Sequence, residues 1–292
     1  MQLEKGENNV LLSIVVPVFT TKERFALTRD FFSECEQYST EFIFVITSID
    51  CDEEFIFDAS GKNQKKIIRS LGSDPGVARN VGMKQASGEW IVFWDPDDKP
   101  NISEIMELIS DARAEKFRMI VGQYEIENES GCLISESRMQ MHLDSNFARN
   151  TGLWRCVFKT DLASSMCFPS LRMAEDQVYL CEFDLDSVDI LFSNKVTYKY
   201  IKYRNGQLTK SRKALQDIPI AILTTKRIID EKGRSTFRLI CMYSQVITGL
   251  RRGSVQTKFA TLKMLFSITY GFKGLGLSST IFGISKCLMI GK

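Results

Sequence analysis

SGEWIVFWDPDD, residues Ser87–Asp98, is the most informative stretch of the sequence. Its centre, Glu89–Trp94, is an apolar run typical of a strand buried on both faces of a sheet. Three carboxylates follow within four residues: Asp95, Asp97 and Asp98. Ligands of open α/β sheets bind beyond the carboxyl ends of the strands. The pattern therefore predicts a ligand site at these aspartates.

Three neighbouring carboxylates repel one another, so the folded chain needs a compensating cation beside them. Oxygen ligands favour Mg²⁺ or Mn²⁺, and a divalent ion held in this way typically binds a diphosphate. A second interpretation stays open, in which the stretch is an acidic turn that opens a helix. In that case Pro96 forms the turn and Asn101 caps the helix.

Strands alternate with helices on both sides of this stretch. VLLSIVVPVF, residues 10–19, predicts a central parallel strand. The first 120 residues then give an open, mainly parallel α/β sheet. The expected elements are a helix over 23–38, strands over 41–47, 65–71 and 89–94, a helix over 76–87, and a helix from Asn101 to about Lys116 with Glu104 completing a capping box.

The pattern changes after Val121. The expected elements are a hairpin turning at 129–131, a strand over 154–159, a helix over 175–183, a strand over 195–203, and helices from Arg212 onward. This half is expected to extend the first sheet and supply the second substrate's site. We expect a catalytic domain over residues 1–210, with a nucleotide-binding half at about 10–120 and an acceptor half at about 121–210. A basic helical region then spans 211–292.

Just upstream of the aspartates, in DPGVARNVGMKQASGEW, a turn leads into a helix, and Arg79 is among the first residues of that helix. Free N–H groups at the start of that helix and the guanidinium can orient phosphate or carboxylate groups at the same sheet edge. A structural ion pair of Arg79 with Asp74 or a strand-end aspartate is the alternative.

With these motifs the sequence resembles the family-2 glycosyltransferases of the GT-A fold. The resemblance is carried by SIVVPVF at Ser13–Phe19, G-x-A-R-N-x-G at Gly76–Gly82, the Ser87–Asp98 stretch, and A-E-D-Q at Ala174–Gln177. Their order and spacing match the family over about residues 10–210.

The resemblance implies a nucleotide-sugar donor held by Pro17, Val18 and Phe19 and by the aspartates. Asp97 and Asp98 would contact the ribose and the metal-bound diphosphate, with Asp95 as a further ligand. Asp176, next to Glu175, matches the family's catalytic base. Displacement at an anomeric carbon also needs a base and a leaving-group stabiliser from different chain segments, which agrees with this assignment. The alternative for this acidic pair is a helix N-terminus that favours carboxylates.

The sequence departs from the family after its second strand, where two aspartates and a glycine are usual. Here Val45 is followed by Ile46, Thr47 and Ser48. A base-reading carboxylate is missing unless Asp50 or Asp52 replaces it. Thr20 stands where the family commonly has asparagine.

Four aromatic or basic candidates remain. His142 is the only histidine, and no partner ligand accompanies it. Trp154 opens LWRCVF, where the family often has tryptophan near the acceptor, although packing explains it equally well. Tyr203 and Arg204 resemble a family segment that returns to the active site, and an edge strand with solvated charges is the alternative.

Charge is distributed unevenly, although the formal net charge is only +2. Residues 1–200 hold more acidic than basic side chains, whereas residues 201–292 hold 17 Lys and Arg against 3 Asp and Glu. Such a tail faces an anionic partner, and without a nucleic-acid motif we expect a phospholipid surface. Leu275–Ile290 is too interrupted to span a bilayer, so an interfacial helix is expected. An amphipathic helix that closes the catalytic domain is the alternative.

Cysteine usage and the N-terminus indicate a reducing cytosol. The eight cysteines form no C-x-x-C pair, and MQLEKGENNV has no apolar signal core. The combined expectation is a cytoplasmic, peripheral-membrane, inverting glycosyltransferase that uses Mg²⁺ or Mn²⁺, with a glycan or lipid-linked acceptor and no nucleic acid. A catalytically degenerate binding protein and a sugar-nucleotide nucleotidyltransferase are the alternatives. The second is disfavoured because Thr20–Arg24 contains no glycine.

Overall fold

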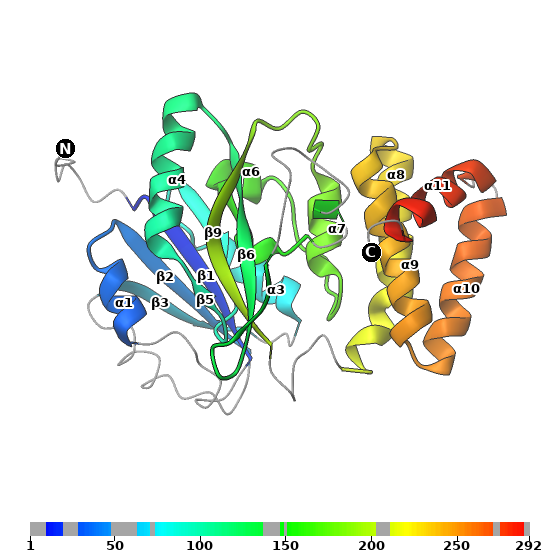
Figure 1. The fold of residues 1–292 in the computed structure, drawn as a ribbon, viewed down its shortest axis with the longest axis horizontal. Coiled ribbons are helices and arrows are strands. Elements are labelled where there is room, and N and C mark those ends of the chain that lie inside the picture. The colour runs from blue at the N-terminus through cyan, green and yellow to red at the C-terminus, as the bar shows by residue number, and fades with distance from the viewer. Residues whose placement is uncertain are drawn as a thin grey trace. The chain divides into compact units, whose positions relative to one another are not determined.

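The computed structural model describes residues 10–19, 29–47, 63–70, 74–136, 147–148, 151–202, 211–270 and 275–288. The chain divides into two compact units, shown within Figure 1. The first contains Met1–Arg138, Leu153–Cys167 and Val188–Lys202, and the second contains Met139–Gly152, Phe168–Ser187 and Tyr203–Lys292. The helical second unit therefore also takes two stretches from before residue 210, where the sequence suggested a boundary.

The amino-terminal half of the sheet is parallel, as predicted. Its strands lie in the order β3-β2-β1-β4. β1, β2 and β4 are buried along their whole length, which is why their sequences show no polar alternation. The strands are β1 (Leu12–Val18), β2 (Thr40–Ile46), β3 (Gln64–Arg69) and β4 (Trp90–Phe93).

The rest of the sheet is mixed. β8 lies between β4 and β6 and runs antiparallel to both, β9 runs parallel to β6, β5 is antiparallel to β9, and β7 is antiparallel to β6. The predicted α/β sheet is confirmed, but beyond β4 most of its strand pairs are antiparallel, and β6 with β9 is the parallel pair among the described strands. These strands are β5 (Lys99–Pro100), β6 (Met119–Asn128), β7 (Leu133–Glu136), β8 (Cys156–Lys159) and β9 (Ile190–Lys202).

Helices cover both faces of the parallel strands. Residues 12, 14, 16 and 18 of β1 share a core cluster with α1 (Arg29–Cys35) and α4 (Ile102–Glu115). The intervening Val15 faces α3 (Pro75–Met83), where a Cβ on Gly82 would lie 2.4 Å from Val15 Cγ1. This three-layer arrangement leaves the carboxyl edge of the strands open to the connecting loops.

The predicted cap of α4 is confirmed only in part. The Asn101 side chain accepts a hydrogen bond from the Glu104 backbone N–H, as an N-cap does. The second half of the expected capping box is wrong, because the Asn101 N–H donates to the Thr197 carbonyl and the Glu104 carboxylate pairs with Lys195. A partner from β9, distant in the sequence, has replaced the local one.

The second unit is helical. α8 (Ile218–Lys232) packs chiefly on α9 (Thr236–Arg252), and α10 (Val255–Tyr270) and α11 (Gly276–Leu288) also pack on α9. α7 (Glu175–Glu182) contacts α8 and α9. None of the helices in the described part of the chain is long and apolar enough to cross a membrane.

Candidate active site

The carboxyl ends of β1, β2 and β4 meet at one edge of the sheet because the three strands are parallel. Val18 ends β1 in a buried position, and the next side chain, Phe19, is 39% exposed. Thr47, after β2, donates both its backbone N–H and its hydroxyl to the Val18 carbonyl. The residue after β2 is therefore a threonine that links the carboxyl ends of β1 and β2. Thr20, Asp50 and Asp52 lie outside the described residues.

The turn after β4 is held from inside by β9. Asp98 is only 1% exposed, and its two oxygens accept hydrogen bonds from the Ile201 N–H at 2.7 Å and the Tyr198 hydroxyl at 2.9 Å. The same hydroxyl accepts from the Asp95 N–H at 3.2 Å. Residues from β9, a hundred positions further along the chain, thus fix the backbone and one carboxyl group of the aspartate turn.

Burial raises the pKa of the Asp98 carboxyl well above its ordinary value, and the nearby charges of Asp95 and Asp97 raise it further. The hydrogen bonds from Ile201 and Tyr198 oppose that shift without cancelling it. Burial, together with the charges of Asp98 and Asp95, also raises the pKa of Tyr198. Asp98 thus has the surroundings of a structural residue, whereas Asp95 and Asp97 are half-buried at the turn.

A divalent metal was predicted on all three aspartates. No group of three or more acidic, His or Cys side chains in the described part of the chain is arranged to hold one. Both oxygens of Asp98 are already engaged by donors, so we leave it out of the proposed ligand set. In nucleotide sites Mg²⁺ is usually held by one or two carboxylates plus phosphate oxygens. Asp97, with Asp95, fits that smaller role.

Arg79 reaches the same turn from α3. Its side chain is 8% exposed, and its Nη2 lies 3.3 Å from Asp95 Oδ1. α3 begins with Pro75 directly after Asp74, an arrangement that favours a helix start. The ion pair with a strand-end aspartate is therefore present, and the role of Arg79 toward phosphate stays a prediction.

Trp154 packs behind the turn. Its ring stacks on Tyr198 with centroids 4.4 Å apart and on Tyr200 at 6.0 Å, and it meets the Tyr124 ring edge-on at 4.9 Å. Packing is thus the role that the structure shows for Trp154. In the described part of that segment, Tyr198 and Ile201 contact the aspartate turn, and the expected return of Tyr203 and Arg204 to the site stays a prediction. Tyr203, Arg204 and His142 lie outside the described residues.

Asp176 belongs to the second unit, at the start of α7. Its Oδ2 accepts a hydrogen bond from the Thr151 hydroxyl at 3.2 Å, and its Oδ1 accepts from the Gln177 N–H at 2.8 Å. Glu175 beside it is buried. Ala174, just before the pair, has a φ of 65°, which an alanine seldom adopts and which costs about 1 kcal/mol or more. Backbone strain at this point is consistent with a constrained functional residue.

Two structural features, one at the site and one at the amino ends of the parallel strands, could not be predicted from local sequence. Tyr198 was one, because its role depends on pairing between β9 and the β4 turn. The other is Glu41, a buried acid on β2 that accepts hydrogen bonds from the Ser13 hydroxyl and from the Ser87 N–H and hydroxyl. Ser13 and Ser87, which open two of the sequence motifs, therefore link β1 and the segment before β4 to β2 through Glu41.

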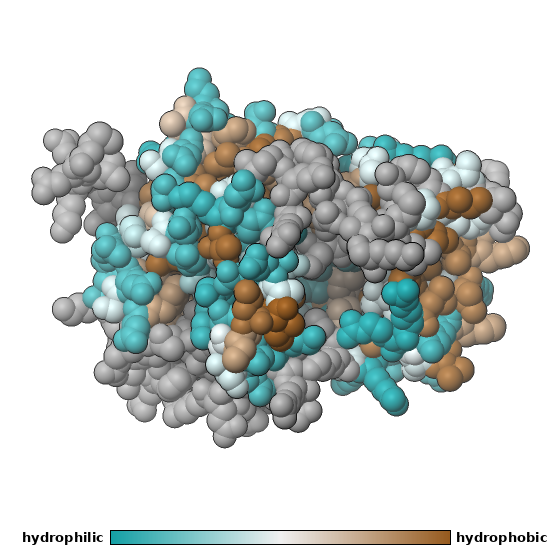
Figure 2. All heavy atoms as spheres, in the orientation of Figure 1, coloured by the Kyte–Doolittle hydropathy of each residue, from teal (hydrophilic) through white to brown (hydrophobic). Residues whose placement is uncertain are grey.

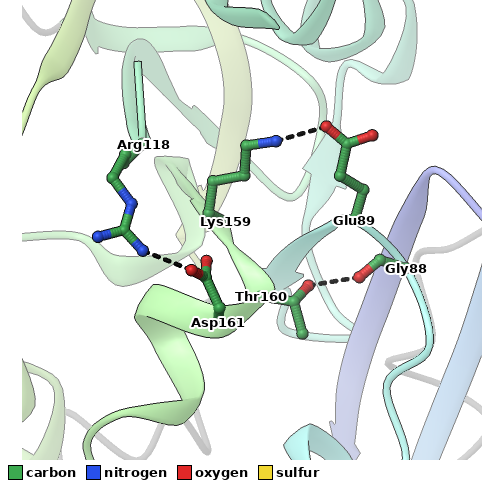
Figure 3. A pocket seen from close by; sticks show the side chains of 6 residues that line it. All are labelled: Gly88, Glu89, Arg118, Lys159, Thr160 and Asp161. Atoms are coloured by element: carbon green, nitrogen blue, oxygen red, sulfur yellow. Dashed lines mark hydrogen bonds and ion pairs between the residues drawn. The ribbon is translucent and has the colours of Figure 1, made fainter. Parts of the chain in front are cut away.

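A pocket at the opposite end of β4 is not a second candidate site (Figure 3). Its charged side chains already neutralise one another: Arg118 pairs with Asp161 at 2.6 Å, and Lys159 pairs with Glu89. Thr160 donates its hydroxyl to the Gly88 carbonyl at 2.6 Å. The contacts fasten β8 to the start of β4.

The sequence profile of glycosyl transferase family 2 matches residues 13–168, a little over half of the chain. The chain belongs to glycosyl transferase family 2. It is 26% identical over 216 residues to the poly(ribitol-phosphate) beta-glucosyltransferase of Bacillus spizizenii, covering 67% of this chain and 33% of that protein. It is 22% identical over 207 residues to the poly(ribitol-phosphate) beta-N-acetylglucosaminyltransferase TarS of Staphylococcus aureus. The chain spans about a third of the length of these relatives.

Solved structures of glycosyltransferases have the same fold. S. aureus TarS in complex with UDP-GlcNAc superposes with a TM-score of 0.69 at 14% identity, covering 95% of this chain and 89% of that one. A mannosyltransferase from Pyrobaculum calidifontis in complex with GDP-Man and Mn²⁺ superposes with a TM-score of 0.57 at 10% identity, covering 95% of this chain and 81% of that one. The predicted GT-A fold is confirmed.

Proposed function

We propose that this family-2 protein transfers a sugar from a nucleoside diphosphate donor to a hydroxyl group of a cell-surface polymer or lipid-linked glycan. The observation that carries the proposal is the aspartate turn after β4, which β9 fixes through Tyr198 and Ile201 at the ligand-binding edge of the sheet. A turn held this firmly offers two half-buried carboxylates, Asp95 and Asp97, in a defined conformation.

Donor binding is assigned to the first unit. Pro17, Val18 and Phe19 end β1 beside the turn, and the exposed ring of Phe19 offers a surface for a nucleoside. Asp97 would hold a divalent ion, Mg²⁺ or Mn²⁺, which would neutralise the diphosphate as it leaves. Arg79 keeps Asp95 in place through their ion pair and adds positive charge near the phosphates.

Asp176 is proposed as the base. It removes the proton from the acceptor hydroxyl while the acceptor oxygen forms a bond to the anomeric carbon and the bond from that carbon to the diphosphate oxygen breaks. The diphosphate leaves with the electron pair, and the configuration inverts because the acceptor oxygen attacks the anomeric carbon on the face opposite the leaving diphosphate. Thr151 orients the Asp176 carboxylate, and Glu175 adds a second negative charge at the start of α7.

The acceptor is inferred from chemistry and from the relatives. Both curated relatives are named for poly(ribitol-phosphate), so a polyol-phosphate or similar polymer hydroxyl is the first acceptor to test. We infer that the chain works in the cytoplasm as a peripheral membrane protein, because its C-terminal region is strongly basic and an anionic lipid surface attracts such a region.

A donor-hydrolysis screen tests the proposal. The full chain is incubated with UDP-glucose, UDP-GlcNAc, GDP-mannose and a CMP-sugar, each with Mn²⁺, with Mg²⁺ or with EDTA, and release of nucleotide is measured. We expect one donor to be hydrolysed in a metal-dependent way. If calorimetry detects no binding of any nucleotide, the degenerate binding protein is favoured instead. Conversion of a nucleotide sugar to a nucleoside triphosphate and a sugar 1-phosphate when pyrophosphate is added would indicate a nucleotidyltransferase.

A further inference from the structure

α10 carries its large apolar side chains on the face turned away from the bundle. Val255, Phe259, Leu262 and Phe266 are 85%, 73%, 53% and 68% exposed. Their spacing places all four on one side of a helix. The buried side carries mostly small polar residues instead: Thr257, Thr261, Ile268 and Thr269. Figure 2 shows hydrophobic residues gathered over this helix. We call the four exposed residues the α10 stripe.

The buried side of α10 packs well without these large side chains. A Cβ on Gly249 of α9 would lie 2.5 Å from the Thr261 hydroxyl oxygen, so the two helices approach closely there. The Thr261 hydroxyl donates within its own helix, to the Thr257 carbonyl, at 2.7 Å. Contacts through glycine and threonine are typical of helices that pack in lipid surroundings. The close contact of α10 with α9 is thus made by small residues on the side opposite Phe259 and Leu262.

Basic side chains border the α10 stripe. Lys258 and Lys263 are exposed and lie on opposite edges of it, and Arg251 and Arg252 are exposed at the end of α9. No Asp or Glu occurs anywhere in residues 232–292. An apolar centre with cationic edges complements a surface that is apolar inside and anionic at its rim.

We propose that the α10 stripe docks on an anionic phospholipid bilayer, with Phe259 and Leu262 entering the acyl boundary and Lys258 and Lys263 contacting headgroup phosphates. The inference deepens the proposed function, on which it rests for the choice of a membrane-linked acceptor. A second copy of the chain is a poorer occupant, because a twofold contact would bring the two sets of cations together.

Vesicle co-sedimentation of the full chain tests this partner. Vesicles contain phosphatidylcholine alone or phosphatidylcholine with about 30% phosphatidylglycerol. We expect binding only to the anionic vesicles. Phe259→Ser/Leu262→Ser should lower the partition coefficient at least tenfold, because each side chain contributes apolar area. Each of Lys258→Ala and Lys263→Ala should lower it about fivefold.

Matched controls change the same chemistry elsewhere. Leu133→Ser/Ile134→Ser removes two exposed apolar side chains from β7, and Lys84→Ala/Lys213→Ala removes two exposed lysines outside α10. Both controls should sediment like the wild type. Circular dichroism of every variant checks that the helices remain folded.

Three results would overturn the proposal: no sedimentation with anionic vesicles, equal sedimentation with both kinds of vesicle, or stripe variants that sediment like the wild type while remaining helical. Self-association in the absence of lipid that the stripe variants abolish would assign the face to a second copy. Donor hydrolysis is measured separately. A chain that binds vesicles but hydrolyses no donor keeps this inference and loses the proposed function, and the converse result does the opposite.

Discussion

Asp98 shows at the level of single residues why three neighbouring aspartates are not equivalent. In the sequence the three carboxylates after β4 look alike, and repulsion among them predicted a shared cation. In the structure, Asp98 is buried and accepts hydrogen bonds from Tyr198 and Ile201, whereas the other two aspartates are half-buried at the edge of the sheet. The position of the cluster could be predicted because a strand leads into it. The difference between Asp98 and the other two aspartates could not be predicted, because the groups that donate hydrogen bonds to Asp98 come from β9.

Removing one hydroxyl group tests this division. Tyr198→Phe keeps the ring on Trp154 but takes a donor from a buried carboxyl and an acceptor from the Asp95 N–H. We expect the free energy of unfolding to fall by about 1–3 kcal/mol. Urea denaturation measures it. Tyr38→Phe, at a half-buried tyrosine packed on the same core, is the control and should change stability by less than half as much. Equal losses would show that the Tyr198 hydroxyl does not support the turn.

At the level of elements, the parallel strands were predictable. The hairpin, β8 and β9 of the other half were also expected, but the pairing that makes this half mixed was not. Continuous apolar runs such as β1 are buried on both faces, so composition and period alone identify them. β5 and β8 are too short to show a period, and their places depend on pairing with β9 and β4. The helix that contains the G-x-A-R-N-x-G motif was predicted. Its last glycine, Gly82, lets α3 approach the sheet, because a Cβ at this position would clash with Val15.

Gly82→Val is expected to push α3 away from the sheet. A Cβ there lies 2.4 Å from Val15 Cγ1 and 3.2 Å from Val45 Cγ2, and both are held in strands. Overpacking of this kind costs about 1–3 kcal/mol of unfolding free energy. Urea denaturation compares the unfolding free energy of Gly82→Val with that of Gln85→Val, a substitution at an exposed position just beyond the same helix. A variant as stable as that control would contradict the packing of α3 described above.

Glu41 predicts a pH dependence. Burial raises the pKa of its carboxyl, but hydrogen bonds from Lys66, Ser13 and Ser87 outweigh burial and hold the pKa below its ordinary value of 4.5. The ionised form therefore stabilises the fold above pH 4.5, and this contribution is lost as the pH falls through the lower, folded-state value. Glu41→Gln should cost about 2 kcal/mol at pH 7 and progressively less below pH 4.5.

Unfolding free energies of wild type and Glu41→Gln, measured in urea from pH 7 to pH 3, check this dependence. Glu115→Gln, at an exposed acid ending α4, is the control and should show no such convergence. A Glu41→Gln deficit that stays constant or widens toward acid pH would contradict the assigned network.

On the scale of the whole molecule, the chain order does not follow the two compact units. The helix that begins with Glu175 and Asp176 belongs with the C-terminal helices. Asp217 accepts hydrogen bonds from the Arg172 backbone and guanidinium, and Arg238 donates to the carbonyls of Cys181 and Phe183. The sequence suggested a boundary near residue 210 because composition changes there, and composition does not reveal such tertiary contacts.

A fragment of residues 1–210 should therefore fail to fold around Asp176. It lacks Asp217 and Arg238, so residues 168–187 lose their hydrogen-bond partners. Limited proteolysis should cleave that stretch rapidly in the fragment and slowly in the full chain. A fragment of residues 1–253, which keeps α8 and α9, should protect it better. Full protection in the 1–210 fragment would support the boundary drawn from sequence.

The proposed division of labour between Asp97 and Asp176 can be measured with two variants and two readouts. UDP binding with Mn²⁺ is followed by calorimetry, and sugar transfer is followed with the donor identified by hydrolysis. We predict that Asp97→Asn weakens nucleotide binding at least tenfold. Asp176→Asn should bind UDP like the wild type while transfer falls by about 10²- to 10⁴-fold. Loss of UDP binding in Asp176→Asn, or transfer that survives in it, would contradict the assignment of Asp176 as the base.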